Sequence, residues 1–331
     1  MNGFIVEREE LYRVIDTYHR DHFLRRLVAN RDTYPPGLMY LSYLGHAVTT
    51  IEPYLSDQQR HALLFGKLAA GAPEDFSNTR LYSALSELTM LSSFARLGAI
   101  DYEARVRPGS RKDIECLAHF EGLEVEIEVK CPDLFPHQAR RAERFQSDDR
   151  VVEEYATRIP GGASSGSILP KDNKVKDFLE DANEKFSSAG TRTERRYSLL
   201  CVSWSHLLNE PLGYCLGLAG LFTDRSFARD EADRPLTFEN VDGVLVTDAL
   251  GWHNDNFGRD EFVRNPFDLA RLENYLIFNP RSSHRIPPLV PDVLNCAVVD
   301  EAWARRNLPD ATIWLKWPFT AGSDEATPGP S

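Results

Sequence analysis

The sequence predicts an α/β protein with a mixed sheet. From about residue 76 onward, helical and strand-like stretches alternate, which is typical of an α/β domain. The chain has 331 residues, of which 42% are hydrophobic, so it can bury a large core. We expect three segments: an N-terminal helical accessory region over 1–75, an α/β domain over 76–320, and a disordered tail over 321–331, which has little to bury.

The N-terminal region is expected to be mainly helical. The stretch EREELYRVIDTYHRDHFLRRLVA, which begins at Glu7, spaces its apolar residues as a helix does, and a Tyr-Pro-Pro-Gly break follows at 34–37. His19 and His22 read as two exposed positions of this helix. A further helix is predicted from about Asn78 to Leu97, ended by Gly98, with one apolar side made of Leu81, Ala84, Leu85, Leu88 and Leu91.

Strands and helices then alternate to the end of the α/β domain. A strand pair over 113–130 is followed by an expected helix over about 138–157 and by a Gly/Ser loop at 159–170. An amphipathic helix comes next, marked by Val175, Phe178, Leu179, Ala182 and Phe186. Three apolar stretches are then predicted as strands, at Tyr197–Trp204, Val241–Thr247 and Asn274–Phe278.

Composition excludes several classes of protein. No run approaches the roughly 18 consecutive apolar residues of a membrane span, and the start, MNGFIVEREELYR, has acids where a secretory signal is basic. We therefore expect a cytoplasmic protein with no membrane partner. The five cysteines are odd in number and form no C-x-x-C pair, which predicts reduced thiols and no disulfide. No H-E-x-x-H or Cys/His ligand spacing indicates zinc.

Any contact with nucleic acid has to be local, because the net charge is −12 and phosphate binding depends on Lys and Arg. The segment RVRPGSRK at 105–112 has four cations and no acid, and QARRAERF from Gln138 and PKDNKVK from Pro170 are also basic. Such runs are usually solvated surface. The candidate nucleic-acid contacts drawn from them are Arg105, Arg107, Arg111, Lys112, Lys171 and Lys174.

The stretch KDIECLAHFEGLEVEIEVKC predicts a hairpin that turns at Glu121-Gly122. A two-residue turn places Phe120 opposite Leu123 and therefore Glu115 opposite Glu128 and Asp113 opposite Lys130. One face of this hairpin is then entirely apolar, as a surface that faces the core should be. The other face carries Asp113, Glu115, Glu126, Glu128 and Lys130.

The acidic face of the hairpin allows two interpretations. Like charges directly opposite each other destabilise a sheet by an amount comparable to the roughly 0.2–1 kcal/mol of a favourable pair, a cost that open water makes tolerable. If another layer covers the face, the acids have to take up protons or bind a cation. Mg²⁺ is usually held by one or two carboxylates plus substrate phosphate, and Asp113 and Glu128 are diagonal neighbours that can supply them.

The ordered acids resemble those of the PD-(D/E)XK nuclease superfamily, which includes many restriction endonucleases. In that family a helix carrying a glutamate precedes a strand with an aspartate, and the next strand ends in Glu-x-Lys or Asp-x-Lys. This chain has Glu87 in SALSELTMLSSFARLG, Asp113 in KDIEC and Glu128-Val129-Lys130 in EIEVK. The resemblance covers about residues 76–205, and Ser110-Arg111-Lys112 stands before Asp113 where the family often has proline.

The resemblance implies a restriction-endonuclease-like mixed central sheet flanked by helices, and a Mg²⁺-dependent nuclease with Mn²⁺ as substitute. Asp113, Glu128 and the carbonyl of Val129 are implied metal ligands, Glu87 supports the metal directly or through water, and Lys130 orients the attacking water. Glu87 also interrupts the apolar row of its helix, between Ala84 and Leu91, where an acid needs a reason. The expected substrate is nucleic acid, DNA above all.

Two other functions stay open at this point. The chain can be a catalytically silent scaffold that keeps the fold and binds protein partners through its N-terminal helices and aromatic C-terminus. The acidic net charge also favours a protein partner that delivers the substrate, and a homo-oligomer is compatible with the sequence.

The second open function is a hydrolase. Gly162–Gly166 matches G-x-S-x-G around Ser164, but the strand and helix that a hydrolase nucleophile needs are missing from its setting. Arg281, His284 and Arg285 are further candidate phosphate contacts.

Overall fold

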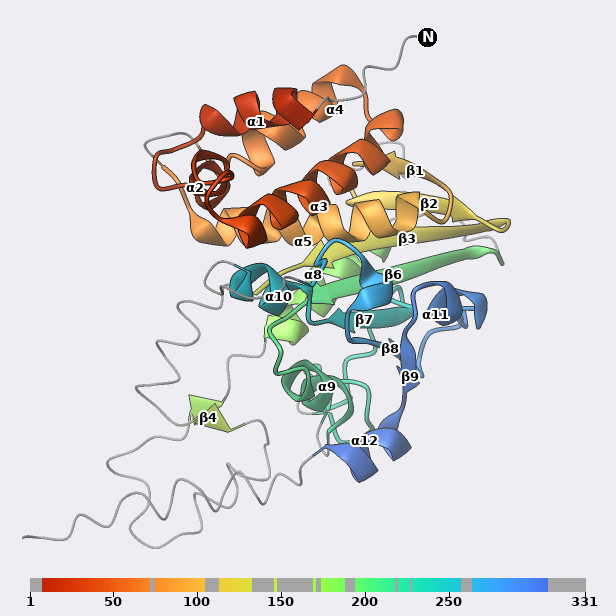
Figure 1. The fold of residues 1–331 in the computed structure, drawn as a ribbon. Helices are drawn as coiled ribbons and strands as arrows, with labels where there is room; N and C mark the ends of the chain where they lie inside the picture. Colours follow the sequence, from red (N-terminus) through yellow and green to blue (C-terminus); the bar gives the residue numbers. More distant parts are fainter. Residues whose placement is uncertain are drawn as a thin grey trace, which may run out of the picture.

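A seven-stranded mixed sheet is the centre of the computed structural model, and helices flank it (Figure 1). The structure describes residues 8–71, 75–104, 113–132, 146–147, 169–170, 174–187, 194–217, 220–226, 228–256 and 264–308. In spatial order the strands are β1 (Ala99–Tyr102), β2 (Cys116–Phe120), β3 (Leu123–Lys130), β6 (Arg196–Ser203), β7 (Gly243–Thr247), β8 (Asn274–Phe278) and β9 (Ala297–Val299).

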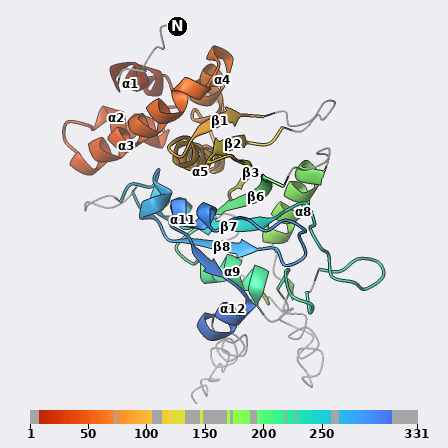
Figure 2. The same cartoon turned by 90° about the vertical axis from the view of Figure 1, so that its right-hand side faces the viewer.

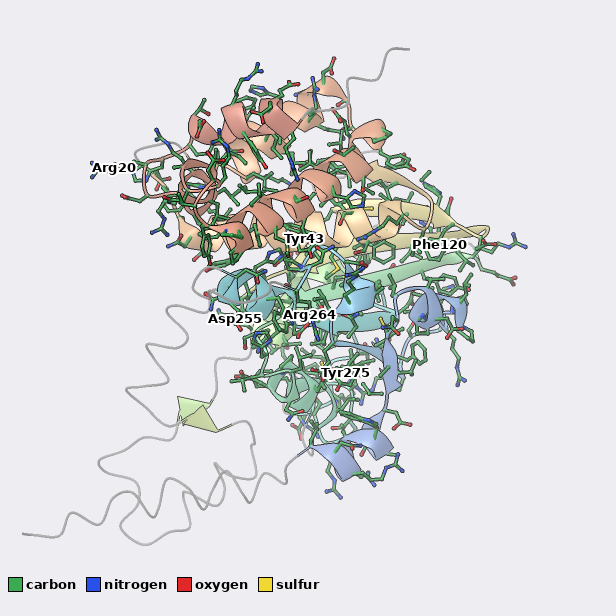
Figure 3. All side chains as sticks on the ribbon, in the orientation of Figure 1. Arg20, Tyr43, Phe120, Asp255, Arg264 and Tyr275 are labelled. Atoms are coloured by element: carbon green, nitrogen blue, oxygen red, sulfur yellow. The ribbon has the colours of Figure 1, made fainter. Side chains whose placement is uncertain are left out.

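The strand directions bring several strand ends to one edge of the sheet. Strands β1, β2 and β3 form an antiparallel meander, β3, β6 and β7 run parallel, β8 is antiparallel to β7, and β9 is parallel to β8. The end of β1, the start of β2 and the end of β3 therefore meet. Phe120 lies at the opposite, hairpin end of the sheet, and Figure 3 shows it far from Asp255. A separate parallel pair joins β4 (Gln146–Ser147) to β5 (Leu169–Pro170).

One face of the sheet is covered by α5 and the N-terminal helices (Figure 1). Helix α5 packs directly against β1, β2 and β3, while α3 and α10 pack on α5. Leu88 and Phe94 of α5 are fully buried in this layer, as are Val125 and Ile127 of β3. The elements on this side are α1 (Arg8–Asp16), α2 (Phe23–Ala29), α3 (Pro35–Ile51), η1 (Glu52–Tyr54), α4 (Asp57–His61), η2 (Ala62–Lys67), α5 (Asn78–Ala95), α10 (Ala249–Asp255), η3 (Leu269–Arg271) and α11 (Leu289–Val293).

The other face is covered by α8 (Lys174–Ser187), α9 (Asn209–Leu216) and α12 (Glu301–Asn307). Val175 and Leu179 of α8 pack with Leu200 and Val202 of β6, so the apolar side of α8 faces the sheet. Figure 2 shows the N-terminal helices and α9 with α12 on opposite sides of the strands. The mixed α/β fold with a central mixed sheet is thus as predicted.

The N-terminal helices belong to the same hydrophobic core as the sheet. A single buried cluster extends from Leu11 in α1 to Leu294 after α11 and crosses the expected boundary at residue 75. Tyr40 of α3 also reaches His253 of α10, with 2.9 Å between the hydroxyl oxygen and Nδ1. Residues 8–71 therefore form a layer of one fold.

His22 is buried, so the prediction that it occupies an exposed helical position is wrong. The helix expected from Glu7 is interrupted, and His22 caps the start of α2, where its Nδ1 accepts a hydrogen bond from the backbone N–H of Leu24. Its Nε2 lies 2.9 Å from the carbonyl oxygen of Leu68. A histidine that satisfies the open end of a helix is held inside by these bonds, and helical spacing does not reveal them.

From Cys116 to Ile127 the hairpin has the predicted register, whereas Ile114, expected on the same face as Cys116, packs in the hydrophobic cluster on the α8 side of the sheet. Phe120 pairs with Leu123 and Cys116 with Ile127, and both turn residues, Glu121 (φ 49°) and Gly122 (φ 74°), have the positive φ that a tight hairpin requires. Gly98 ends the α5 segment close to β2, where an added Cβ would lie 2.1 Å from the carbonyl oxygen of His119. Glycine at this position lets β1 begin directly after the helix.

Other predicted elements have mixed outcomes. Strands β6, β7 and β8 match their predicted stretches, and α8 follows the predicted apolar positions. Of the helix expected over 138–157, the structure describes only Gln146 and Ser147, which form strand β4. The rest of that stretch, most of the 159–170 loop and the 321–331 tail lie outside the described residues. All five cysteines are free thiols, and none of the described helices combines the length and apolar character of a membrane span.

Candidate functional site

The acidic face of the hairpin is buried, which overturns the interpretation of a solvated face for two of its acids. The side chains of Glu126 and Glu128 are both 0% exposed. Strand β6 lies parallel beside β3, and the crossover helix α8 covers this side of the strands. An alternation of apolar and charged residues predicts two faces, but it does not show which of them a later helix will cover.

Glu128 is held by two ammonium groups. Its Oε1 lies 2.9 Å from Nζ of Lys130 and 2.5 Å from Nζ of Lys185. Lys130 also lies 2.6 Å from Oδ2 of Asp181. Asp181 and Lys185 are one turn apart on α8, so they share a side of the helix. These two residues do not stand out in the sequence, because a charged pair beside an apolar helix face is typical of any surface helix.

Glu87 is buried on α5 and has two partners. Its Oε1 accepts hydrogen bonds from Nζ of Lys67 at 2.7 Å and from the hydroxyl of Tyr102 at 2.8 Å. Nζ of Lys67 also lies 3.1 Å from Oε1 of Glu103 and 3.6 Å from Oε2 of Glu115. Lys67 comes from the N-terminal helical region and was not predicted as a site residue.

Glu115 links the two groups of charges. Its pKa is raised to about 7 by burial first and by Glu87 next, while Lys67 opposes the shift, and Glu128 and Lys185 also act on it. The backbone supports this position, since the N–H of Glu103 donates to the carbonyl oxygen of Glu115 at 2.9 Å. We use the name acidic cluster for Glu87, Glu103, Glu115, Glu128 and Asp181 together with Lys67, Lys130 and Lys185.

Burial and charge oppose each other inside the acidic cluster. Burial raises the pKa of Glu87, and the ammonium of Lys67 counteracts part of that shift. For Lys67, burial by itself lowers the pKa, but the carboxylates of Glu87 and Glu115 outweigh it and raise the pKa above its ordinary value. The pKa of Lys130 is raised in the same way, by Glu128 and Asp181 against burial. Lys67 and Lys130 therefore stay protonated.

The acidic cluster carries more negative than positive charge. Among these eight described residues, five carboxylates face three ammonium groups, so the carboxylates outnumber the ammonium groups by two when all the acids are ionised. Oε2 of Glu128 is also buried and has no hydrogen-bond partner among the described residues. A buried carboxylate oxygen in a region of surplus negative charge is suited to a hard cation such as Mg²⁺.

The described residues do not contain a ready-made metal site. Within this part of the chain, no three His, Cys, Asp or Glu side chains are arranged so that they could hold a metal ion. Lysine ammonium groups lie against Glu87 and Glu128. A metal ion would have to share these carboxylates with the lysines or displace them.

The structure brings some of the predicted site residues together. Lys130 contacts Glu128, and Glu87 lies in the same acidic cluster through Lys67 and Glu115. Asp113 is partly buried just before β2, but the acid of this stretch whose charge is coupled to both Glu87 and Glu128 is Glu115, two residues later. Val129 pairs with Cys201 of β6. Metal binding by Asp113 and by the Val129 carbonyl stays a prediction.

Glu126 is neutralised separately from the acidic cluster. Its Oε2 accepts a hydrogen bond from the hydroxyl of Ser198 at 2.8 Å. Its Oε1 lies 2.8 Å from Nε of Arg196, an ion pair whose N–H does not point along a good hydrogen bond. Glu126 therefore has a structural role between β3 and β6.

The predicted nucleic-acid contacts are only partly described. Lys174 begins α8 and lies 3.5 Å from Oδ2 of Asp177. Arg281 donates to the carbonyl oxygen of Thr223 at 2.9 Å and pairs with Asp224, so its guanidinium is used inside the protein. The candidates outside the described residues are Arg105, Arg107, Arg111, Lys112 and Lys171, and Ser164 lies outside them as well.

Comparisons with other proteins add no family to this picture. No protein-family model, no curated protein and no solved structure matches the chain. The acidic cluster and the resemblance of its motif are therefore what point to a function.

Proposed function

We propose that this protein is a Mg²⁺-dependent nuclease that hydrolyses phosphodiester bonds in nucleic acid, with DNA as its substrate. The observation that carries the proposal is the convergence of Glu87, Glu115, Glu128 and Lys130 in one cluster with surplus negative charge. Their order along the chain, a helix glutamate, then an acid, then Glu-x-Lys at the end of the next strand, resembles that of the PD-(D/E)XK family, in which the second acid is an aspartate carried by a strand.

Binding of a divalent metal requires the lysines to yield their places beside the carboxylates, because no three acids of the described residues are arranged to hold a metal ion as they stand. Glu128 offers a buried oxygen without a hydrogen-bond partner in the described part of the chain, and Glu115 or Asp113 supplies the second carboxylate. The carbonyl of Val129 is the third candidate ligand. When bound, Mg²⁺ supplies Lewis acidity that lowers the pKa of a water and neutralises charge on the phosphoryl group.

Lys130 is positioned for a role in the reaction. Nζ is fixed by two carboxylates, at 2.9 Å from Glu128 and at 2.6 Å from Asp181, and the side chain is 22% exposed. An ammonium in this position can orient the attacking water and stabilise negative charge as it develops on the phosphate. Asp181 and Glu128 then act as positioning residues for the ammonium group.

The alternative is a catalytically silent protein that keeps this fold and binds partners. One observation favours it: Glu128 is already neutralised by Lys130 and Lys185, the second at 2.5 Å. In this case the acidic cluster is a structural ion network, and the surplus charge is removed by protonation of an acid whose pKa is raised, such as Glu115.

A cleavage assay separates the two functions. The purified chain is incubated with plasmid, linear duplex, single-stranded DNA and RNA, each with Mg²⁺, Mn²⁺ or EDTA. We expect metal-dependent cleavage of DNA that falls by about 10²–10³-fold in Glu128→Gln and in Lys130→Met. Glu124→Gln is the matched control, because Glu124 lies on the same strand near the hairpin end, 3.8 Å from Arg196.

Three outcomes would contradict the proposal. Cleavage that persists in a Glu128→Ala, Lys130→Ala double variant would place the active site elsewhere. If no substrate is cleaved and calorimetry detects no binding of Mn²⁺, the silent scaffold is the correct function. Loss of hydrolysis in Ser164→Ala alone would indicate a serine hydrolase.

A further inference from the structure

Lys67 reaches from the N-terminal helices into the carboxylates of the acidic cluster. Its ammonium lies 2.7 Å from Oε1 of Glu87, 3.1 Å from Oε1 of Glu103 and 3.6 Å from Oε2 of Glu115. It also lies 4.9 Å from the ring centroid of Tyr102. The Lys67 ammonium thus lies against three carboxylates, one from α5 and two from the edge of the sheet.

The chain around Lys67 has an unusual backbone. Lys67 is the last residue of η2, a π-helical turn, and the N–H of Leu68 donates to the carbonyl oxygen of Leu63 at 2.8 Å. Such turns contain an extra residue relative to an α-helix and frequently occur at functional sites. Two residues with positive φ follow, Ala70 at 59° and Gly71 at 112°. A return of η2 to α-helical spacing would change the position of Lys67.

Lys67 lies closer to solvent than the two carboxylates of Glu87 and Glu115, although Glu103 is more exposed still. Its side chain is 30% exposed, whereas that of Glu87 is 10% exposed. If the ammonium moves into water, the hydroxyl of Tyr102 still donates to Oε1 of Glu87 and holds the carboxylate in place. Another cation could then bind the carboxylates without competition from the Lys67 ammonium.

We propose that Lys67 is an internal counter-cation that competes with the divalent metal ion for Glu87 and Glu115, so that the N-terminal helices control metal loading. The inference rests on the proposed function only for the metal site. An ammonium and a divalent ion that share carboxylate oxygens repel each other, and this repulsion is strong in a site shielded from water. Exchange of one ammonium for one divalent ion raises the positive charge from three to four against five carboxylates.

Calorimetry with Mn²⁺ on the full chain tests this inference. Lys67→Met removes the charge and keeps the apolar stem, and we expect it to bind Mn²⁺ about tenfold more tightly than the unmodified protein. Lys67→Arg keeps the charge and should bind Mn²⁺ as the unmodified protein does. Arg60→Met is the matched control: it removes one positive charge from the same region, where Arg60 pairs with Glu52 at 3.3 Å.

A second measurement does not need a variant. In the unmodified protein, amine acylation followed by peptide mass spectrometry reports how accessible Lys67 is. Without metal, Lys67 should react slowly because its ammonium is engaged by carboxylates, and saturating Mn²⁺ should accelerate its reaction. This result is independent of whether Lys67→Met folds.

The outcomes separate this inference from the proposed function. Equal or weaker Mn²⁺ binding by Lys67→Met, or no binding by any variant, overturns the inference, as does Lys67 reactivity that Mn²⁺ leaves unchanged. If Lys67→Met binds Mn²⁺ more tightly but no variant cleaves nucleic acid, the inference stands and the nuclease function fails. If the protein cleaves DNA while Lys67→Met leaves the Mn²⁺ affinity unchanged, the nuclease stands and the inference fails.

Discussion

The hydroxyl oxygen of Tyr40 lies 2.9 Å from Nδ1 of His253, deep in the core. The other ring nitrogen, Nε2, lies 3.0 Å from the hydroxyl of Thr89. Because Thr89 donates to backbone carbonyls, its hydroxyl accepts from Nε2–H, and Nδ1 accepts from Tyr40. A single neutral imidazole therefore joins α3, α5 and α10.

The burial of His253 predicts a loss of stability in mild acid. Burial lowers its pKa from 6.5 to about 3. Between these values the unfolded chain binds a proton that the folded protein refuses, so the stabilisation is complete above pH 6.5 and is lost as the pH falls. From pH 6.5 to 5.5 this residue should remove about 1 kcal/mol from the free energy of unfolding.

Urea unfolding at the two pH values measures this effect. His253→Gln should show a shallower fall in the free energy of unfolding than the unmodified protein, because one titrating group is gone. His119→Gln, which changes a partly exposed histidine of β2, is the control. Equal slopes for the unmodified protein and His253→Gln would mean that His253 does not titrate as its burial predicts.

The Tyr40 hydroxyl should contribute to stability through His253. Tyr40→Phe leaves Nδ1 of His253 buried without this donor, and the expected loss in the free energy of unfolding is about 1–3 kcal/mol. Tyr43→Phe is the matched control on the same helix (Figure 3), where Tyr43 is partly exposed and a change within about 0.5 kcal/mol is expected. Similar losses in both variants would argue against a special role of the Tyr40 bond.

Lys185 should stabilise the fold by neutralising Glu128. Lys185→Met leaves the buried carboxylate with Lys130 as its remaining cation, and we expect a loss of about 1.5–3 kcal/mol in the free energy of unfolding. Arg305→Met is the control, since its partner Glu301 is a neighbour on exposed α12 and such pairs contribute little.

If Glu128 binds metal, Mn²⁺ should raise the melting temperature of Lys185→Met more than that of the unmodified protein. Equal shifts would contradict metal binding by Glu128.

Glu115 should be more important for metal binding than Asp113. The resemblance assigns the ligand to Asp113, whereas the structure couples the charge of Glu115 to both Glu87 and Glu128. We expect Glu115→Gln to weaken Mn²⁺ binding by about tenfold or more, and Asp113→Asn to have the smaller effect. Calorimetry on the two variants side by side decides the point, and a larger loss in Asp113→Asn would restore the assignment from the motif.

Local chemistry is sufficient to predict several parts of this protein. The hairpin register follows from a two-residue turn that tolerates positive φ and from the period of two between apolar residues. Glu87 stood out because an acid interrupts an apolar helix row, and the Glu-x-Lys order stood out along β3. These features depend on neighbours in the sequence, so the sequence by itself determined the mixed α/β class, the hairpin and most of the candidate acids.

The tertiary structure alone decided the electrostatic setting of these acids. Lys67 and Glu87 are 20 residues apart, and Lys185 and Glu128 are 57 residues apart. No periodicity links such pairs, since they meet only when η2 packs near α5 and when α8 crosses over β3 to bring β6 alongside. Burial then turns an ordinary charged face into one that needs counter-cations, because removing carboxylates from water is costly unless positive charge lies beside them.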